Sequence, residues 1–200
     1  MLFALSALSA LPVLAADDDA EGRREISARY LLMDANGQAV SNEDFPGSFQ
    51  LIAFGYTCCP DICPTTLAEM SVIMVKLGKE SDRLQPLFIT VDPQRDTAAI
   101  LRDYTVFFHP RIMGLTGWPA LVKRAAENFR VRYEKVSEPG NPPDQYAVDH
   151  SAGMYLLGPD GLYIRKFAFA TPPGEIAERI GEIMANTANR PQSRRGRPGR

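Results

Sequence analysis

The chain of 200 residues has few side chains that bind metals or form covalent links: three cysteines and two histidines. All three cysteines lie between residues 58 and 63, in the stretch TCCPDICP. No cysteine elsewhere in the chain can pair with them, so a disulfide between distant segments is excluded. A bridge that closes so short a loop removes little entropy from the unfolded chain, which argues against a purely structural role for these cysteines.

The sequence also lacks a large excess of charge and a long hydrophobic run. The formal net charge of −2 gives no reason to expect nucleic-acid binding. Residues 1–16, MLFALSALSALPVLAA, form an apolar stretch that is shorter than the roughly 20 residues of a transmembrane helix. The stretch is typical of a secretory signal peptide, although no lysine or arginine precedes Arg23. We therefore expect residues 1–15 to be a signal or short export segment of a periplasmic protein, either cleaved or kept as a tether to the inner membrane.

The order of predicted elements indicates an α/β protein. Periodicity and turn signals predict two hairpins, one at 27–40 with its turn at Asn36-Gly37 and one at 152–169. Strands are predicted at 49–56, 84–92 and 131–136. Helices are predicted at 64–79, at 95–108 with Asp96 or Thr97 near its cap, at 117–129, and at 174–187, where the helix is amphipathic. Strands that alternate with helices imply a mostly parallel sheet, to which the last hairpin adds antiparallel strands. We predict one domain over residues 25–188, with a mixed sheet flanked by helices and an N-terminal β-hairpin. Residues 189–200 contain five arginines and no acid, and we expect a disordered basic tail.

The cysteine segment follows the first central strand and opens a helix, which is the thioredoxin-type arrangement. Cys59 and Cys63 are four residues apart, a spacing that places two side chains on one face of a helix or turn, about 5–6 Å apart at Cβ. That separation suits joint binding of one metal ion, and a small adjustment would permit a disulfide. The partial positive charge at a helix N-terminus favours the thiolate form.

The two histidines differ in their surroundings. His150 follows a polar loop at the end of the predicted sheet that carries the cysteines, whereas His109 follows a helix and has no acidic neighbour. Two thiolates and one imidazole suit copper in either oxidation state and can also hold zinc. A structural zinc site normally has four protein ligands, and the sequence offers three candidates. We expect His150 to join the cysteine pair and His109 to be an ordinary surface or capping residue.

Four motifs occur in the order FGYTCCPDICPTTL, VDPQRDT, GLTG and YAVDHSAGMYLLGPDG. Through them, the chain from about Ser27 to Met184 resembles the Sco/SenC family of copper-binding, thioredoxin-like proteins. The resemblance implies that Cys59, Cys63 and His150 bind copper for the binuclear copper centre in subunit II of cytochrome c oxidase. It also implies three partners, namely that subunit, a thioredoxin-like reductant and another copper chaperone.

Four further residues near these motifs are candidates for supporting roles. The resemblance favours a place for Asp92 near the metal, with a turn or helix-capping role as the alternative. Asp149 is a candidate to orient the neighbouring imidazole, although adjacent side chains on a strand often point apart. We expect Asp61 to help the turn or face a partner. Cys58 is not expected to share an ion with the next cysteine, because adjacent side chains point in different directions.

Two functions from different classes remain open. The first is a copper chaperone, which binds and transfers metal and is not an enzyme. The second is a thiol–disulfide oxidoreductase that uses Cys59 and Cys63 to keep target thiols reduced. Thioredoxin-like reductases generally use CxxC, and His150 has no obvious task in the second function, so the chaperone is favoured. The paired spacing and the DHS motif disfavour a peroxide-reducing enzyme, which needs one peroxidatic cysteine.

Overall fold

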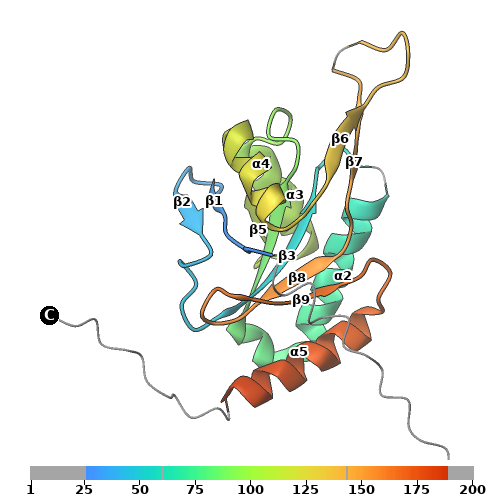
Figure 1. Cartoon of the computed structure of the whole chain (residues 1–200). Coiled ribbons are helices and arrows are strands. Elements are labelled where there is room, and N and C mark those ends of the chain that lie inside the picture. The colour runs from blue at the N-terminus through green and yellow to red at the C-terminus, as the bar shows by residue number, and fades with distance from the viewer. Residues whose placement is uncertain (1–25, 60, 143, 189–200) are drawn as a thin grey trace, which may run out of the picture.

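The computed structural model describes residues 26–59, 61–142 and 144–188 (Figure 1). The predictions for residues 1–15 and 189–200 lie outside these ranges. A five-stranded sheet forms the centre, with the spatial order β5 (Met113–Leu115), β4 (Leu84–Thr90), β3 (Phe49–Gly55), β8 (Met154–Leu157) and β9 (Tyr163–Phe167). The first three strands are parallel, whereas β8 and β9 run antiparallel to their neighbours. The predicted α/β, thioredoxin-like architecture with a mixed sheet is therefore confirmed.

The central strand β3 is buried along its whole length. Its Ile52 pairs with Leu87 of β4 on one side and with Tyr155 of β8 on the other. A strand covered on both faces has a continuous apolar sequence, as FQLIAFG has, which is why this strand could be predicted. The cysteine segment begins where β3 ends, so a fully buried strand of the sheet leads into the loop that carries the cysteines.

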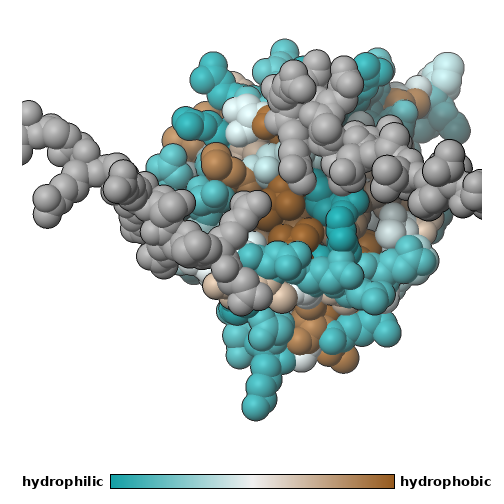
Figure 2. Space-filling model, turned by 60° about the horizontal axis from the view of Figure 1, so that its bottom comes forward, coloured by the Kyte–Doolittle hydropathy of each residue, from teal (hydrophilic) through white to brown (hydrophobic). Residues whose placement is uncertain are grey.

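Helices cover the sheet, and their bounds are α2 (Ile62–Leu77), α3 (Ala98–Phe108), α4 (Pro119–Asn128) and α5 (Pro173–Ala188), with a 3₁₀ helix η1 (Gly78–Arg83) after α2. Helix α2 packs against α5 and α3, and α4 packs against the N-terminal hairpin. Helix α5 is amphipathic as predicted, because Ile176, Ile180 and Met184 are buried. On the face that Figure 2 turns forward, hydrophilic side chains surround smaller hydrophobic areas. Among the described residues, no helix is both long and apolar enough to span a membrane.

The N-terminal hairpin is confirmed as β1 (Leu31–Met33) paired antiparallel with β2 (Ala39–Ser41). Its turn is held by the Asp34 carboxylate, which accepts hydrogen bonds from the backbone N–H groups of Asn36 and Gln38 at 2.8 Å each. Gly37 has a φ of 75°, a conformation that glycine adopts without strain. The Asn36-Gly37 signal therefore identified the turn correctly.

The strand predicted at 131–136 exists, but it lies outside the main sheet. It forms β6 (Tyr133–Val136), which pairs antiparallel with β7 (Ala147–His150) in a separate two-stranded ribbon that projects from the body (Figure 1). Strand β7 was not predicted, because its four residues adjoin a polar loop and give no clear periodicity. The edge strand β5 was also missed, since three residues are too few to establish an alternation.

Candidate metal centre

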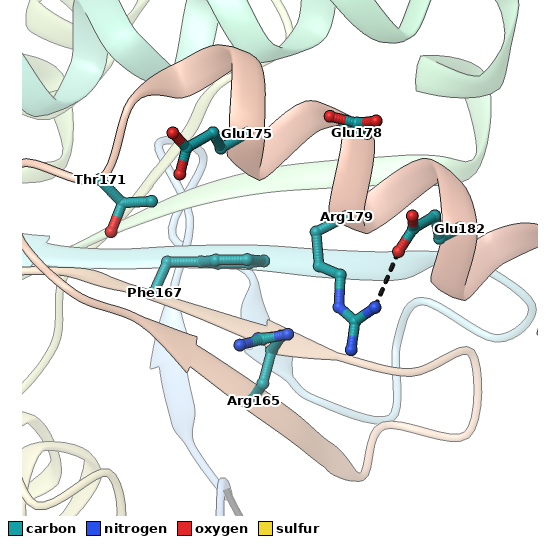
Figure 3. Close-up of a pocket in the computed structure, with 7 residues that line it drawn as sticks. All are labelled: Arg165, Phe167, Thr171, Glu175, Glu178, Arg179 and Glu182. Carbon is teal, nitrogen blue, oxygen red and sulfur yellow. Dashed lines mark hydrogen bonds and ion pairs between the residues drawn. The ribbon is translucent and has the colours of Figure 1, made fainter. Parts of the chain in front are cut away.

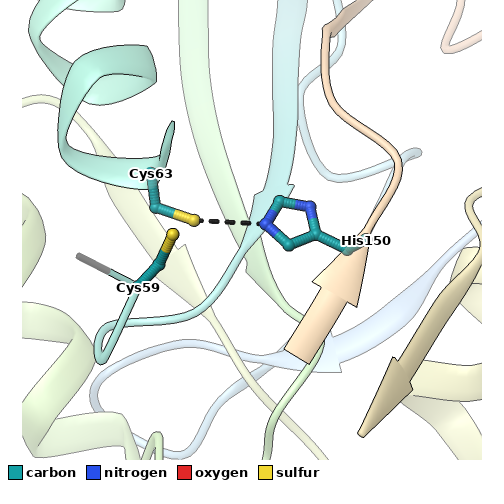
Figure 4. A group of neighbouring side chains, drawn as sticks. All are labelled: Cys59, Cys63 and His150. Atoms are coloured by element: carbon teal, nitrogen blue, oxygen red, sulfur yellow. Dashed lines mark hydrogen bonds between the residues drawn. The ribbon is translucent and has the colours of Figure 1, made fainter. Parts of the chain in front are cut away.

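The three predicted ligands come together from three different elements (Figure 4). Cys59 lies in the loop after β3, Cys63 is the second residue of α2, and His150 is the last residue of β7. Their ligand atoms all lie within 4.8 Å of one another, and Cys63 Sγ is 3.4 Å from His150 Nε2. In Figure 4 the two sulfur atoms lie close together on the side of the imidazole that carries Nε2. One ion placed between these atoms would be within reach of all three side chains.

Tyr56, the residue that follows β3, contacts all three candidate ligands. Its backbone N–H donates to Cys63 Sγ at 3.4 Å, and its carbonyl accepts from the backbone N–H of Cys59 at 3.3 Å. Its ring meets the His150 imidazole edge-on, with centroids 6.0 Å apart. Sequence reasoning assigned no role to Tyr56. The available signal was its place between a buried strand and the first motif cysteine.

The two thiols differ in acidity. Burial alone would raise the pKa of Cys59, but hydrogen bonds from the Asp61 backbone, from Cys63 and from the Ile62 backbone outweigh that effect and lower it. Burial raises the pKa of Cys63 far above its ordinary range, and the N–H of Tyr56 offsets only part of the rise. Cys59, in the loop just before α2, is therefore the thiol that ionises first. Cys63 lies in the first turn of α2, where the helix dipole favours a thiolate, but burial outweighs that effect.

The imidazole of His150 presents one nitrogen to the thiols. Its Nδ1 atom is 3.2 Å from the carbonyl oxygen of Ser151. A carbonyl can only accept, so Nδ1 carries the hydrogen and Nε2 keeps its lone pair. Burial lowers the pKa of His150, although the Ser151 carbonyl and the charge of Asp149 act in the opposite direction. The neutral form with a free Nε2 is the form that binds metals.

The two aspartates predicted near the site have different surroundings. Asp92 is fully buried, and its carboxylate accepts hydrogen bonds from the Tyr146 hydroxyl and from Arg95. The Arg95 guanidinium lies 5.6 Å from the centroid of the Tyr56 ring, which joins Asp92 to the site indirectly. Asp149 is exposed and acts on the imidazole through its charge, since the Ser151 carbonyl takes the hydrogen bond. Their supporting roles stay predictions.

The structure also shows the surroundings of the remaining candidates. Cys58 is exposed and does not belong to the close group of three ligand atoms. Asp61 is the N-cap residue of α2, but its side chain makes no capping hydrogen bond. His109 ends α3 as its C-cap, and its Nδ1 accepts a hydrogen bond from the backbone N–H of Arg111 at 3.1 Å.

Two hollows on the surface differ in their relation to the ligands. A pocket of about 430 Å³ lies between β9 and α5, and Arg179 forms an ion pair with Glu182 at 2.7 Å in its wall (Figure 3). None of the three candidate ligands lines it. A pocket of about 390 Å³ adjoins the ribbon, and its wall contains His150 together with Arg132 and Asp149. The imidazole can therefore be approached from solvent on the ribbon side.

Comparison with known proteins identifies the family. Residues 18–185 match the family model described as SCO1/SenC. Over 158 residues the chain is 39% identical to a SCO2-like protein of Rickettsia felis, across 79% of this chain and 77% of that protein. The fold resembles copper-bound ScoI of Bradyrhizobium japonicum, with a TM-score of 0.71 and 38% identity over 78% of this chain and 98% of that one. Copper-bound ScoI of Arabidopsis thaliana gives a TM-score of 0.74 and 31% identity, over 80% and 99% of the two chains. The chain belongs to the SCO1/SenC family.

Proposed function

We propose that this protein binds copper through Cys59, Cys63 and His150 and serves as a copper chaperone in the assembly of cytochrome c oxidase. The observation that carries the proposal is the approach of two sulfur atoms and one imidazole nitrogen within 4.8 Å of one another. Copper is the cargo of such a protein. The copper-bound relatives of Bradyrhizobium japonicum and Arabidopsis thaliana support the choice of metal.

The donor set itself favours copper over zinc. Thiolates are soft ligands that hold Cu(I), and the imidazole adds a donor that suits Cu(II). Within the described ranges, this is the one group of three or more cysteine, histidine or acidic side chains close enough to share an ion. A structural zinc site would ordinarily need a fourth protein ligand. Three ligands leave a position open, through which a metal ion can pass to another protein.

We further propose that the acceptor is subunit II of cytochrome c oxidase, whose binuclear copper centre receives the metal. A thioredoxin-like reductant and another copper chaperone complete the proposed set of partners, since Cys59 and Cys63 must be reduced before they take up copper. The periplasm is the proposed compartment. These partners and this location come from the family resemblance and from the apolar N-terminal stretch.

A genetic experiment tests the function in the cell. Cells that lack this protein should have low cytochrome oxidase activity when copper is scarce, and added copper should restore part of it. The parent gene should restore activity, whereas a Cys63→Ser gene should not. Normal oxidase activity in the deletion strain under copper limitation would contradict the chaperone function.

The thiol–disulfide oxidoreductase remains the second candidate, because the two thiols differ in acidity. A partly exposed Cys59 with a lowered pKa suits the attacking thiol, and the buried Cys63 suits the thiol that resolves the mixed disulfide. Replacing His150 distinguishes the two functions experimentally. A His150→Ala variant should lose the copper function, but it should still reduce a disulfide in a copper-free assay.

A further inference from the structure

Asp96 is a buried carboxylate that is not one of the proposed metal ligands. It is fully inaccessible to solvent, in the segment between β4 and α3. The sequence offered Asp96 or Thr97 as the cap of the helix, and the N-cap of α3 is Thr97, whose hydroxyl accepts from the backbone N–H of Ile100. Burying a carboxylate is costly unless its oxygens are hydrogen-bonded, so its contacts indicate what it does.

The Asp96 carboxylate joins the cysteine segment to the end of β4. Its Oδ1 accepts from the Thr57 hydroxyl at 2.6 Å, and its Oδ2 accepts from the Thr57 backbone N–H at 3.1 Å. Oδ2 also accepts from the Thr90 hydroxyl at 2.6 Å. The backbone carbonyl of Asp96 accepts from the Thr116 hydroxyl at 3.0 Å, which fixes the same residue from the side of β5.

Thr57 lies in the loop next to the residue whose backbone contacts both cysteines. It follows Tyr56, whose backbone contacts Cys63 through its N–H and Cys59 through its carbonyl. Thr57 is also the second residue of the turn that this Tyr56–Cys59 hydrogen bond closes. A side chain that holds both the backbone and the hydroxyl of Thr57 therefore limits where Cys59 can lie relative to Cys63.

We propose that Asp96 is a positioning residue for the metal centre, which holds Thr57 and thereby sets the distance between the Cys59 and Cys63 sulfur atoms. The copper part of this inference rests on the proposed function, but the distance between the thiols does not. Three donors converge on this site, and a carboxylate accepts at both oxygens without donating, which explains why an acid occupies a buried position. Hydrogen bonds that orient metal ligands from outside the ligand set typically change metal affinity about 10–100-fold when removed.

The test uses four single variants of the full chain. Asp96→Ala removes the whole link, and Thr57→Val removes its hydroxyl bond but keeps the bond from the backbone N–H. Asp96→Asn keeps an oxygen for Thr57 and turns its amide toward the Thr90 hydroxyl. Thr105→Val is the matched control, because it removes a buried hydroxyl that donates only within α3, to the Arg102 carbonyl. Folding is checked by circular dichroism and thermal melting. Thr57→Val keeps the test decisive if Asp96→Ala does not fold, since Thr57 is only partly buried.

The first measurement is made on metal-free protein, equilibrated with reduced and oxidised glutathione. In this exchange the two thiols lose two electrons and two protons to form the Cys59–Cys63 bond, and glutathione disulfide is reduced to two glutathione molecules. Misplaced thiols form the bond less readily. Asp96→Ala should lower the equilibrium constant for disulfide formation about tenfold, which raises the reduction potential by about 30 mV. Thr57→Val should change both in the same direction but by less, because the backbone N–H of residue 57 still donates to Asp96. Asp96→Asn should recover most of this loss, and Thr105→Val should match the parent.

The second measurement is copper binding by the reduced variants. Asp96→Ala should bind at least about tenfold more weakly than the parent, and Thr57→Val should be weakened less. Both should have a changed Cu(II) absorption spectrum. If the parent itself bound no copper, the proposed function would fail, while the glutathione result would still decide the role of Asp96. Parent-like equilibrium constants and spectra for folded Thr57→Val and Asp96→Ala would overturn the inference.

Discussion

The sulfur atom of Cys63 lies 3.4 Å from the Nε2 atom of His150, although 87 positions separate the two residues in the chain. The contact joins the first turn of α2 to the end of the β6/β7 ribbon. The other imidazole nitrogen faces the Ser151 carbonyl at 3.2 Å, so the ring is held with its free nitrogen toward the thiol. Copper binding should therefore depend on this histidine as well as on the cysteines.

Replacing His150 by alanine removes one of three donors. We expect Cu(II) affinity to fall at least about 100-fold, and Cu(I) affinity to fall less, because imidazole is the better match for Cu(II). His109→Ala is the control, since His109 caps α3 and is not part of the group of three. Competition titration with a chelator of known affinity measures both variants. Parent-like Cu(II) binding by His150→Ala would rule out the three-ligand site.

Serine substitution at each cysteine distinguishes the two cysteines that bind copper from the one that does not. Cys59→Ser and Cys63→Ser should each abolish tight copper binding and the sulfur-to-copper absorption band. Cys58→Ser should keep the stoichiometry and the spectrum of the parent, because the Cys58 thiol is exposed and outside the close group. If Cys58→Ser altered the band as strongly as the other two variants, Cys58 would have to be counted as a ligand.

The reduced, metal-free thiols should react in a fixed order. The thiolate is the nucleophile, and Cys59 combines a lowered pKa with partial exposure, whereas Cys63 is buried with a raised pKa. In a Cys58→Ser background at pH 7, iodoacetamide should modify Cys59 at least about ten times faster than Cys63. Mass spectrometry of the digested protein gives both rates. Equal rates would show that the surroundings described for the two thiols do not control their reactivity.

Alkaline pH should destabilise the metal-free protein through Cys63. Its pKa is raised by burial in the folded state, so above the ordinary thiol pKa of about 8.5 the unfolded chain releases a proton that the folded chain retains. The contribution of this thiol to the free energy of unfolding is fully present below that pH. It decreases as pH rises, by up to about 1.4 kcal/mol per pH unit. Denaturant unfolding under reducing conditions should show a smaller alkaline loss for Cys63→Ser than for the parent. Parallel curves for the two proteins between pH 8 and pH 11 would contradict the expectation.

The parts of the fold that could be predicted are those with a strong local signal. β3 reads as a continuous apolar run, α5 has its isoleucines at helical spacing, and Asn36-Gly37 marks a tight turn. The pairing of β6 with β7 could not be predicted, because their contact depends on residues on both sides of a polar loop and neither strand is long. Strand β5 is fixed by its parallel pairing with β4 and not by its own three residues.

The ligands could be proposed because cysteine and histidine are rare in this chain and carry distinctive chemistry. The residues that position these ligands could not be proposed from the sequence. Tyr56 acts mainly through its backbone, which any residue supplies, and Asp96 contacts Thr57 from 39 positions away. An aspartate before a helix is ordinarily read as a cap, and only the folded chain shows that its carboxylate points to the cysteine segment instead.

Copper titration of the reduced protein, followed by X-ray absorption spectroscopy of the copper-loaded sample, tests the central claim most directly. We predict one copper per chain, with two sulfur ligands and one imidazole nitrogen, and no tight binding once Cys59 and Cys63 are joined in a disulfide. Acid should weaken binding, because protons compete for the thiolates and the imidazole. Equal copper uptake by the oxidised protein, or a copper ion without sulfur ligands, would contradict the account.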